Sequence, residues 1–213
     1  MAKKIAADIG TLRLPADLTI PDGAGGVVIF AHGSGSSRLS PRNILVAERL
    51  NGAGFATILF DLLTDEEAAD RANVFDINLL GGRMSEALAF ARSHRQLRRF
   101  PVGFFGASTG AAAALVAAAR HGGEVAAVVS RGGRPDLALD RLGEVRAPTL
   151  LIVGGFDEPV IDMNRTALAA LHCEKRLEIV PGATHLFEEP GKLDRVVLLA
   201  TDWFARHLRV EQK

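Results

Sequence analysis

Short, continuously apolar segments alternate along the chain with longer segments of helical periodicity. Apolar runs rich in β-branched and aromatic residues favour strands that are buried on both faces. Such strands are predicted at residues 27–31, 55–60, 102–105, 125–130, 149–153 and 177–180. Helices are predicted between them, at about 41–52, 77–94, 109–121, 161–171 and 191–207. This alternation predicts an α/β fold with a mostly parallel sheet and helices on both faces.

Two segments depart from this alternation. Residues 3–20 alternate loosely between apolar and polar positions, which predicts two short antiparallel strands joined by a turn at Gly10-Thr11. The acidic stretch 64–76 is expected to be a surface loop or a short helix. Because the chain of 213 residues shows no linker or repeat, a single domain over 1–213 is predicted.

Composition narrows the class of protein. Apolar residues make up 48% of the chain, enough for a sizeable core, and 25 basic residues balance 25 acidic ones. This balance argues against a nucleic-acid partner, and no apolar run is long enough to span a membrane. The single cysteine, Cys173, and the absence of a secretory signal at the N-terminus favour a cytoplasmic protein. No pattern predicts an oligomeric state.

The segment Gly106-Ala107-Ser108-Thr109-Gly110 ends a predicted strand and opens a predicted helix. It matches G-x-S-x-G in the strand–turn–helix setting of a nucleophile elbow, in which a tight turn exposes the serine. Glycines are expected because side chains flanking such a turn would clash. Ser108 is therefore the candidate nucleophile; the alternative is a glycine-rich turn with a helix-capping serine.

A serine hydroxyl needs a base, and the base needs an orienting carboxylate. His185 follows a strand directly, so it is expected at the same sheet edge as Ser108. Asp157 follows the preceding strand and is the candidate acid; Glu158 and Asp136 are the alternatives, and Asp157 could instead cap a helix. The other histidines after the serine lie at or near predicted helix ends: His121, His172 and His207.

Acyl transfer also needs donors for the developing oxyanion. The backbone N–H of Thr109 follows the nucleophile, and a second donor is expected in the loop 32–35, where the N–H of Ser34 is favoured. A glycine-rich loop before a helix could instead hold a phosphate, but this loop lacks the lysine of a P-loop.

Four motifs together resemble the dienelactone-hydrolase-like branch of the α/β-hydrolase superfamily. They are HGSGSS (32–37), GASTG (106–110), GGFDEPV (154–160) and GATHLF (182–187). The resemblance covers about residues 25–207 and implies a Ser-His-Asp hydrolase, without cofactor or metal, that cleaves carboxylic esters or lactones through an acyl-enzyme. Dienelactone hydrolases proper use a cysteine nucleophile, so Ser108 favours a general esterase over a true dienelactone substrate.

Only residues 131–148 separate the fourth and fifth buried strands, too few for a large helical lid. An open or shallow pocket for small, soluble substrates is therefore expected. Arg131 and Arg134 in this segment, with Arg38 or Arg42, could bind a substrate carboxylate; the alternative is that they are solvated loop residues.

The sequence thus predicts a serine hydrolase for a small ester or lactone. A non-catalytic binding or scaffold protein of the same fold is the alternative of another class, since a fold does not determine a function. A thioesterase or peptidase would use the same three residues.

Overall fold

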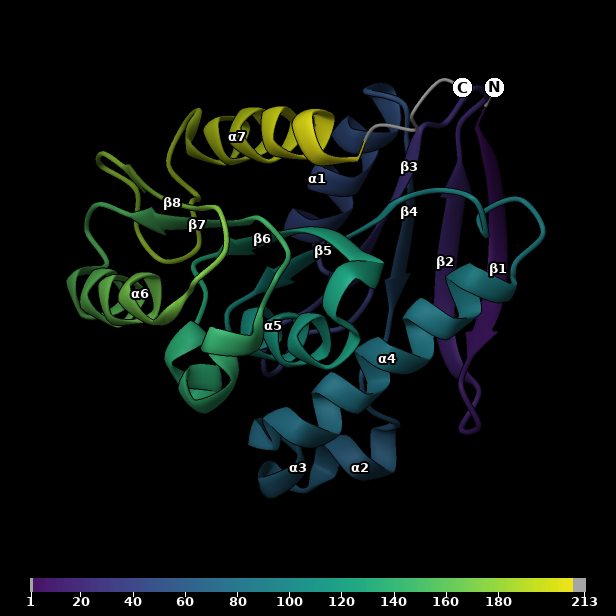
Figure 1. Ribbon diagram of the computed structural model, residues 1–213, viewed down its shortest axis with the longest axis horizontal. Helices are drawn as coiled ribbons and strands as arrows, with labels where there is room; N and C mark the ends of the chain where they lie inside the picture. Colours follow the sequence, from purple (N-terminus) through teal and green to yellow (C-terminus); the bar gives the residue numbers. More distant parts are fainter. Residues whose placement is uncertain (1, 209–213) are drawn as a thin grey trace.

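The computed structural model describes residues 2–208; residue 1 and residues 209–213 of the predicted domain lie outside the described part (Figure 1). Within it, the strands are β1 (Lys3–Ile9), β2 (Leu14–Ile20), β3 (Gly26–Ala31), β4 (Phe55–Phe60), β5 (Val102–Ala107), β6 (Val125–Arg131), β7 (Thr149–Gly154) and β8 (Lys175–Val180). They form one sheet in the order β1-β2-β4-β3-β5-β6-β7-β8. The predicted α/β fold with a mostly parallel sheet is confirmed.

The first two strands form the antiparallel part of the sheet. β1 pairs with β2 in a hairpin, and β2 pairs antiparallel with β4, whereas all later pairs are parallel. Alternate residues of β2 are buried, as expected of a strand with one covered face, while every residue of β3, β4 and β5 is buried. The hairpin predicted over residues 3–20 is therefore confirmed.

Helices cover both faces of the sheet (Figure 1). The helices are α1 (Pro41–Gly52), α2 (Asp65–Ala69), α3 (Arg71–Phe75), α4 (Ile77–Ser93), α5 (Thr109–His121), α6 (Glu158–Ala170) and α7 (Lys192–His207), with short 3₁₀ helices η1 (Gly122–Glu124) and η2 (Pro135–Glu144). α1 and α7 lie on one face, and α4, α5 and α6 lie on the other. The acidic stretch is resolved into the two short helices α2 and α3.

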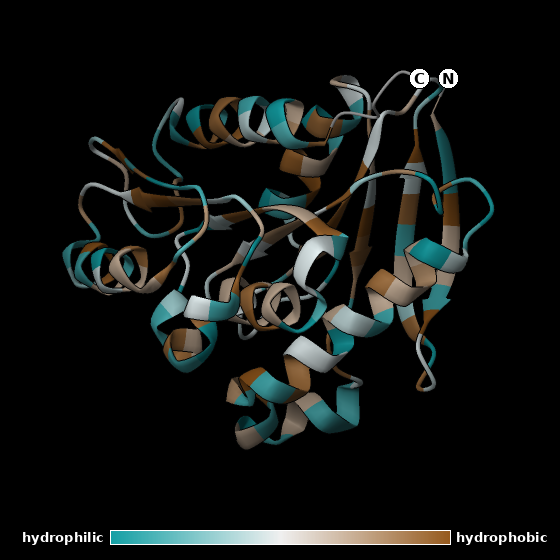
Figure 2. Cartoon of the chain, in the orientation of Figure 1, coloured by the Kyte–Doolittle hydropathy of each residue, from teal (hydrophilic) through white to brown (hydrophobic). Residues whose placement is uncertain are grey.

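Successive residues of the central strands pack into two separate cores. Val28 and Phe30 of β3 pack with residues of α1 and α7, whereas Val27 and Ile29 pack on the α4 and α5 side. Burial on both faces explains why these strands are continuously hydrophobic, as Figure 2 shows.

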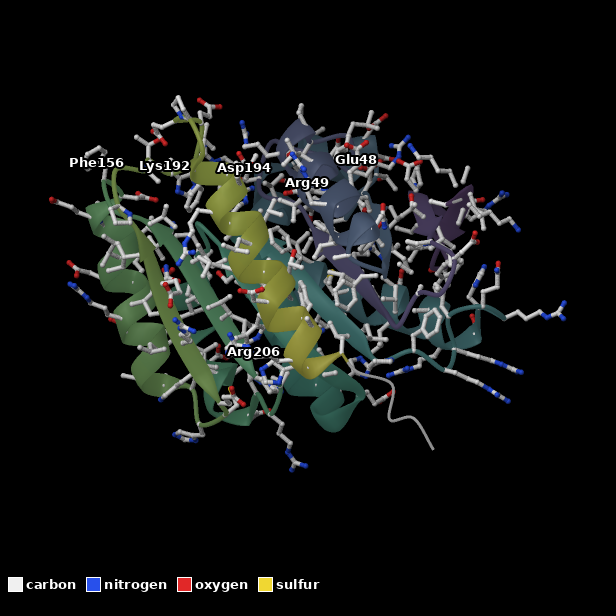
Figure 3. All side chains as sticks on the ribbon, turned by 90° about the horizontal axis from the view of Figure 1, so that it is seen from above. Glu48, Arg49, Phe156, Lys192, Asp194 and Arg206 are labelled. Carbon is white, nitrogen blue, oxygen red and sulfur yellow. The ribbon has the colours of Figure 1, made fainter. Side chains whose placement is uncertain are left out.

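The face formed by α1 and α7 is seen in Figure 3, where the first turn of α7 lies beside the end of α1. Arg49 of α1 and Asp194 of α7 approach to 3.9 Å there. Both side chains are largely exposed, so this pair contributes little to stability.

The segment between β6 and β7 is occupied by η2, which packs against α5 and α6. In the described residues, no helix longer than these ten residues is inserted between the two strands. The carboxyl ends of β3, β5, β6, β7 and β8 therefore carry only short loops, which hold the candidate site residues. None of the helices in residues 2–208 has the length and apolar character needed to cross a membrane.

Candidate active site

Ser108 sits in a strained turn between β5 and α5. Its φ of 52° and ψ of −124° are unfavourable for a residue with a side chain, and such strain is typical of functional turns. A Cβ atom on Gly106 would lie 2.4 Å from Cα of Ala111, and one on Gly110 would lie 2.3 Å from the carbonyl oxygen of Ala31. Only glycine fits at either position. The clash at Gly110 would be with the end of β3 and not with Gly106.

Asp157 and His185 are in direct contact. Nδ1 of His185 lies 2.6 Å from Oδ2 of Asp157, and the carboxylate is 14% exposed against 40% for the imidazole. Asp157 occupies the position before the first residue of α6, yet its side chain makes no capping hydrogen bond. The carboxylate is therefore engaged by the histidine and not by the helix, which removes the capping alternative.

The alternative acids lie elsewhere. Glu158 is exposed on the first turn of α6, and Asp136 is paired with Arg134. The other histidines near helix ends also lie apart from the elbow. Nδ1 of His121 is 3.5 Å from Glu124, Nε2 of His207 is 3.6 Å from Glu174, and the ring of His172 lies beside Gly143 of η2.

A cavity of about 220 Å³ contains the elbow, and both Ser108 and His185 line it. Arg42 and Asn43 of α1, Arg131 at the end of β6, and Leu186 form other parts of its wall. Since His185 holds Asp157, the structure brings the three predicted catalytic residues to one edge of the sheet.

The loop after β3 lies against the nucleophile. A Cβ atom on Gly33 would be 2.9 Å from Cβ of Ser108, so only glycine allows this approach. The next N–H, that of Ser34, donates to Oγ1 of Thr109 at 2.9 Å. Thr109 is the first residue of α5, where a backbone N–H has no partner within the helix. Ser34 and Thr109, the two predicted oxyanion residues, thus lie beside Ser108. The hydroxyl of Thr109 accepts a hydrogen bond from the N–H of Ser34.

The side chain of His32 connects the loop after β3 to the loop after β4. The N–H of Leu62 donates to its Nε2 at 3.1 Å, so Nδ1, 3.0 Å from the carbonyl oxygen of Gly33, carries the proton. Burial lowers the pKa of His32 despite the opposing effects of its contact with Gly33 and of the Asp61 carboxylate. The ring is therefore a neutral link between the loops after β3 and β4, a role that the sequence reasoning missed.

Two of the predicted substrate-binding arginines are engaged by carboxylates. Arg38 binds Asp61 at 2.6 Å and Asp17 at 3.2 Å, and Arg134 binds Asp136 through two hydrogen bonds of 2.9 and 2.8 Å. Neither lines the cavity that contains Ser108. The structure therefore places neither guanidinium group at the candidate site. Arg131 and Arg42, in contrast, do line it.

A second cavity, of about 260 Å³, lies on the other side of the loop after β3. Leu62, Leu63, Val74 and Leu80 form an apolar part of its wall, and the serines of the loop after β3, the carboxylates of Asp61 and Asp65, and Thr109 form a polar part. The sequence reasoning missed this cavity, because the part of its wall that comes from α2, α3, α4 and the loop after β4 carries no motif. Among residues 2–208, no three His, Cys, Asp or Glu side chains are grouped so as to hold a metal ion.

Comparison of the sequence and the fold with known proteins shows the family to which the chain belongs. The family model described as the dienelactone hydrolase family matches residues 14–207. The chain belongs to the dienelactone hydrolase family. The chain is also similar to the crystal structure of a dienelactone hydrolase from Anabaena variabilis, with 54% sequence identity and a TM-score of 0.93. The match covers 98% of this chain and 99% of that one.

Two further comparisons define how far the likeness extends. Est1E from Butyrivibrio proteoclasticus shares the fold, with a TM-score of 0.81 at 16% identity over 96% of this chain and 98% of that one. A Mycobacterium tuberculosis (strain H37Rv) protein named "putative phosphoribosyl transferase" is 58% identical over 199 residues, which are 93% of this family member and 45% of that protein. The chain thus spans less than half the length of this curated relative.

Proposed function

We propose that the protein is a serine hydrolase that cleaves small carboxylic esters or lactones through an acyl-enzyme on Ser108. The observation that carries the proposal is the 2.6 Å contact between His185 and Asp157 at the cavity that also contains Ser108. A carboxylate that accepts from Nδ1 leaves Nε2 free as the base, which is the arrangement that activates a serine hydroxyl.

In the first half-reaction, Oγ of Ser108 attacks the ester carbonyl while His185 takes its proton. The tetrahedral oxyanion accepts hydrogen bonds from the N–H groups of Ser34 and Thr109. The carbon–oxygen bond to the alcohol then breaks, and His185 gives the proton to the departing oxygen. Asp157 stabilises the imidazolium that exists between these two proton transfers.

In the second half-reaction, water replaces the alcohol. His185 removes a proton from the water as it attacks the acyl carbonyl, and the bond to Ser108 breaks as its oxygen regains a proton from His185. The products are a carboxylic acid and, from the first half-reaction, an alcohol; a lactone gives a single hydroxy acid. The small volumes of the two cavities favour short acyl and alcohol groups.

Thioesters and amides could be attacked by the same groups, so substrate profiling must include them. The name of the Mycobacterium tuberculosis relative also raises phosphoribosyl transfer, but it describes a protein of which this chain covers 45%. We expect no pyrophosphate release from phosphoribosyl pyrophosphate by this chain, because the proposed machinery serves acyl transfer.

The test uses 4-nitrophenyl acetate and butyrate with the wild type, Ser108→Ala, and Ser93→Ala, which removes an exposed hydroxyl from the end of α4. We expect turnover and fluorophosphonate labelling in the wild type and S93A, and the loss of both in S108A. Equal activity in S108A would exclude Ser108 as the nucleophile. A folded wild type that neither turns over any ester, thioester or amide nor labels would favour a non-catalytic binding protein.

A further inference from the structure

The balanced net charge of the chain conceals an uneven distribution of charge. Residues 87–123 contain five arginines and no aspartate or glutamate. Three of these arginines, Arg95, Arg98 and Arg99, lie in the short segment between α4 and β5, and all three are exposed. In residues 2–208 no carboxylate oxygen lies within 4.0 Å of any of the three guanidinium groups. Their charges are therefore balanced only by the solvent and its ions.

A single turn presents the three guanidinium groups on one side. The N–H groups of Leu97 and Arg98 both donate to the carbonyl oxygen of His94, at 3.0 and 2.9 Å, as in a helix. Residues three and four positions apart share a face of such a turn, so Arg98 and Arg99 lie on the same side as Arg95. Leu97 lies on the opposite side, where it is fully buried in the core that includes α4. The turn thus has an apolar face toward the protein and a cationic face toward solvent.

Hydrogen bonds hold both ends of this segment. Arg92, at the end of α4, donates through Nη1 to the carbonyl oxygen of Phe100 and through Nη2 to that of Glu124, both at 2.8 Å. The carbonyl oxygen of Pro101 accepts from the N–H of Val27 in β3. Because the segment is already ordered, binding through its cationic face would cost little conformational entropy.

The stability of the fold does not explain the cluster. Like charges three or four positions apart on one helical face repel each other. A neutral or acidic side chain at any of the three positions would relieve this repulsion, and exposed side chains contribute little packing. A partner that supplies negative charge accounts for the cluster instead.

The cationic face lies at the edge of the sheet opposite the candidate active site. It directly precedes β5, whose six residues span about 20 Å, and Ser108 follows the other end of that strand. In Figure 1 the segment after α4 curves past β1 at the outer side of the sheet. β1 runs parallel to β4 and β5, so the exposed Lys3 at its start lies at the same edge. We call the set of Lys3, Arg95, Arg98 and Arg99 the basic edge.

The shape and composition of the basic edge favour a membrane surface over other anions. The three arginines line none of the larger cavities in the described part of the chain, so they do not enclose a small anion. Single-stranded nucleic acids stack on aromatic rings, and residues 92–99 contain no Phe, Tyr or Trp. Lipid headgroups diffuse within a bilayer and can gather beneath a fixed cluster of cations.

The acidic helices α2 and α3 favour one orientation on such a surface. Their exposed Asp65, Glu66 and Asp70 lie near the start of α4, whereas the three arginines follow its end (Figure 1). Since the net charge is zero, an anionic surface attracts the protein only when the basic edge faces it and the acidic helices are held away.

We propose that the basic edge is a docking surface for an anionic lipid bilayer. The contact is electrostatic and reversible, because residues 92–100 expose no large hydrophobic side chain for insertion. When the basic edge lies on the bilayer, the cavity with Ser108 at the opposite edge of the sheet faces the water. Substrates therefore reach the site from solution and not from the membrane.

The experiment measures co-sedimentation of the protein with vesicles at low and at high ionic strength. One set contains equal parts of phosphatidylglycerol and phosphatidylcholine, and the other contains phosphatidylcholine alone. The patch variant removes three charges from the basic edge: Arg95→Gln, Arg98→Gln and Arg99→Gln. The control variant removes three charges from exposed positions elsewhere: Arg13→Gln, Arg49→Gln and Arg165→Gln. The two variants have the same net charge.

We expect the wild type and the control variant to bind the anionic vesicles at low ionic strength, and the partition coefficient of the patch variant to be about 100-fold lower. High ionic strength should release the protein, and phosphatidylcholine alone should not bind it. On anionic vesicles, amide hydrogen exchange should slow in residues 94–101 and stay unchanged in residues 181–187. Thermal unfolding should show the patch variant to be at least as stable as the wild type, because it loses a repulsion.

Several outcomes would overturn the proposal. If the wild type fails to bind anionic vesicles, docking to a bilayer is excluded. Equal losses in the patch and control variants would trace binding to net charge, and lower stability of the patch variant would give the arginines a structural role. Arginine-dependent binding of a duplex oligonucleotide without binding of vesicles would assign the surface to nucleic acid. None of these measurements uses ester turnover, so their outcome is independent of the proposed hydrolase function.

Discussion

Oδ2 of Asp157 lies 2.6 Å from Nδ1 of His185, although the two residues belong to separate loops after β7 and β8. The parallel pairing of the two strands places their carboxyl ends together, with Gly154 opposite Val180. A Cβ atom on Gly154 would lie 2.5 Å from the carbonyl oxygens of Ala183 and Thr184, so the close approach of the loops depends on this glycine. The carboxylate–imidazole contact is therefore set by the sheet rather than by either loop alone.

Replacing Asp157 by Asn should inactivate the protein without unfolding it. The amide is nearly isosteric, but it no longer holds the proton on Nδ1 or stabilises the imidazolium, so kcat should fall by about three to four orders of magnitude. Ester turnover and thermal unfolding are measured for Asp157→Asn beside Glu158→Gln, which changes the exposed neighbour. Activity retained in D157N but lost in E158Q would assign the acid to Glu158.

Replacing Gly110 by Ala should disrupt the elbow. The new Cβ would lie 2.3 Å from the carbonyl oxygen of Ala31, and backbone atoms cannot yield as a flexible side chain does. We expect the free energy of unfolding to fall by about 1–3 kcal/mol or more, together with loss of ester turnover. Gly123→Ala is the control, because nothing lies within 4 Å of its Cβ position. Wild-type stability and turnover in G110A would refute the steric account of this turn.

The strands and helices could be predicted closely from the sequence because burial on both faces leaves a continuous hydrophobic signal. The exceptions lie where that signal is weak. β8 begins at Lys175, two residues before the predicted start at Leu177, because its first residues are exposed at the sheet edge. α6 begins at Glu158 rather than near residue 161, directly after the loop that carries Asp157.

For the candidate site, the positions of Ser108, Asp157 and His185 could be predicted because each residue follows a strand of a parallel sheet, whose carboxyl ends meet at one edge. The arginines were not, because a loop sequence does not specify which acid a long side chain reaches. Arg38 binds Asp61, 23 positions away, and the Ser34–Thr109 contact spans 75 positions. Such contacts depend on how the strands are arranged and leave no local pattern.

Removing the hydroxyl of Thr109 should free an oxyanion donor. The N–H of Ser34 now donates to Oγ1 of Thr109, so in the transition state it must exchange this bond for one to the oxyanion. Thr109→Val leaves the donor unpaired in the free protein. We expect the free energy of unfolding to fall by about 1 kcal/mol and kcat to rise by about two- to ten-fold.

The control for this prediction is Thr109→Ser, which keeps the hydroxyl and should retain both wild-type values. Denaturant unfolding and ester turnover are measured for the two variants together. A fall in kcat for T109V, with T109S unaffected, would mean that the hydroxyl holds the loop in its active position and does not compete with the oxyanion.

The buried ring of His32 should make stability depend on pH. Its pKa lies below the ordinary value because burial disfavours the charged form, so in the acidic range the unfolded chain binds a proton that the folded protein does not. The free energy of unfolding should be at its full value above the unfolded pKa of about 6.5 and should fall as the pH drops from there toward the folded pKa. Protonation would also bring a second N–H against the N–H of Leu62, which now donates to Nε2.

Urea unfolding of the wild type and His32→Gln between neutral and mildly acidic pH measures this contribution. The variant should be less stable at neutral pH, because it loses the fit of the ring between Gly33 and Leu62, and it should lose less stability on acidification. His121→Gln, which removes a histidine outside these two loops, is the control. If H121Q flattens the profile as much as H32Q, the pH dependence does not arise from His32. If H32Q flattens the profile and H121Q does not, acid weakens the link that holds the loop after β3 beside Ser108. Ester turnover should then decline over the same pH range.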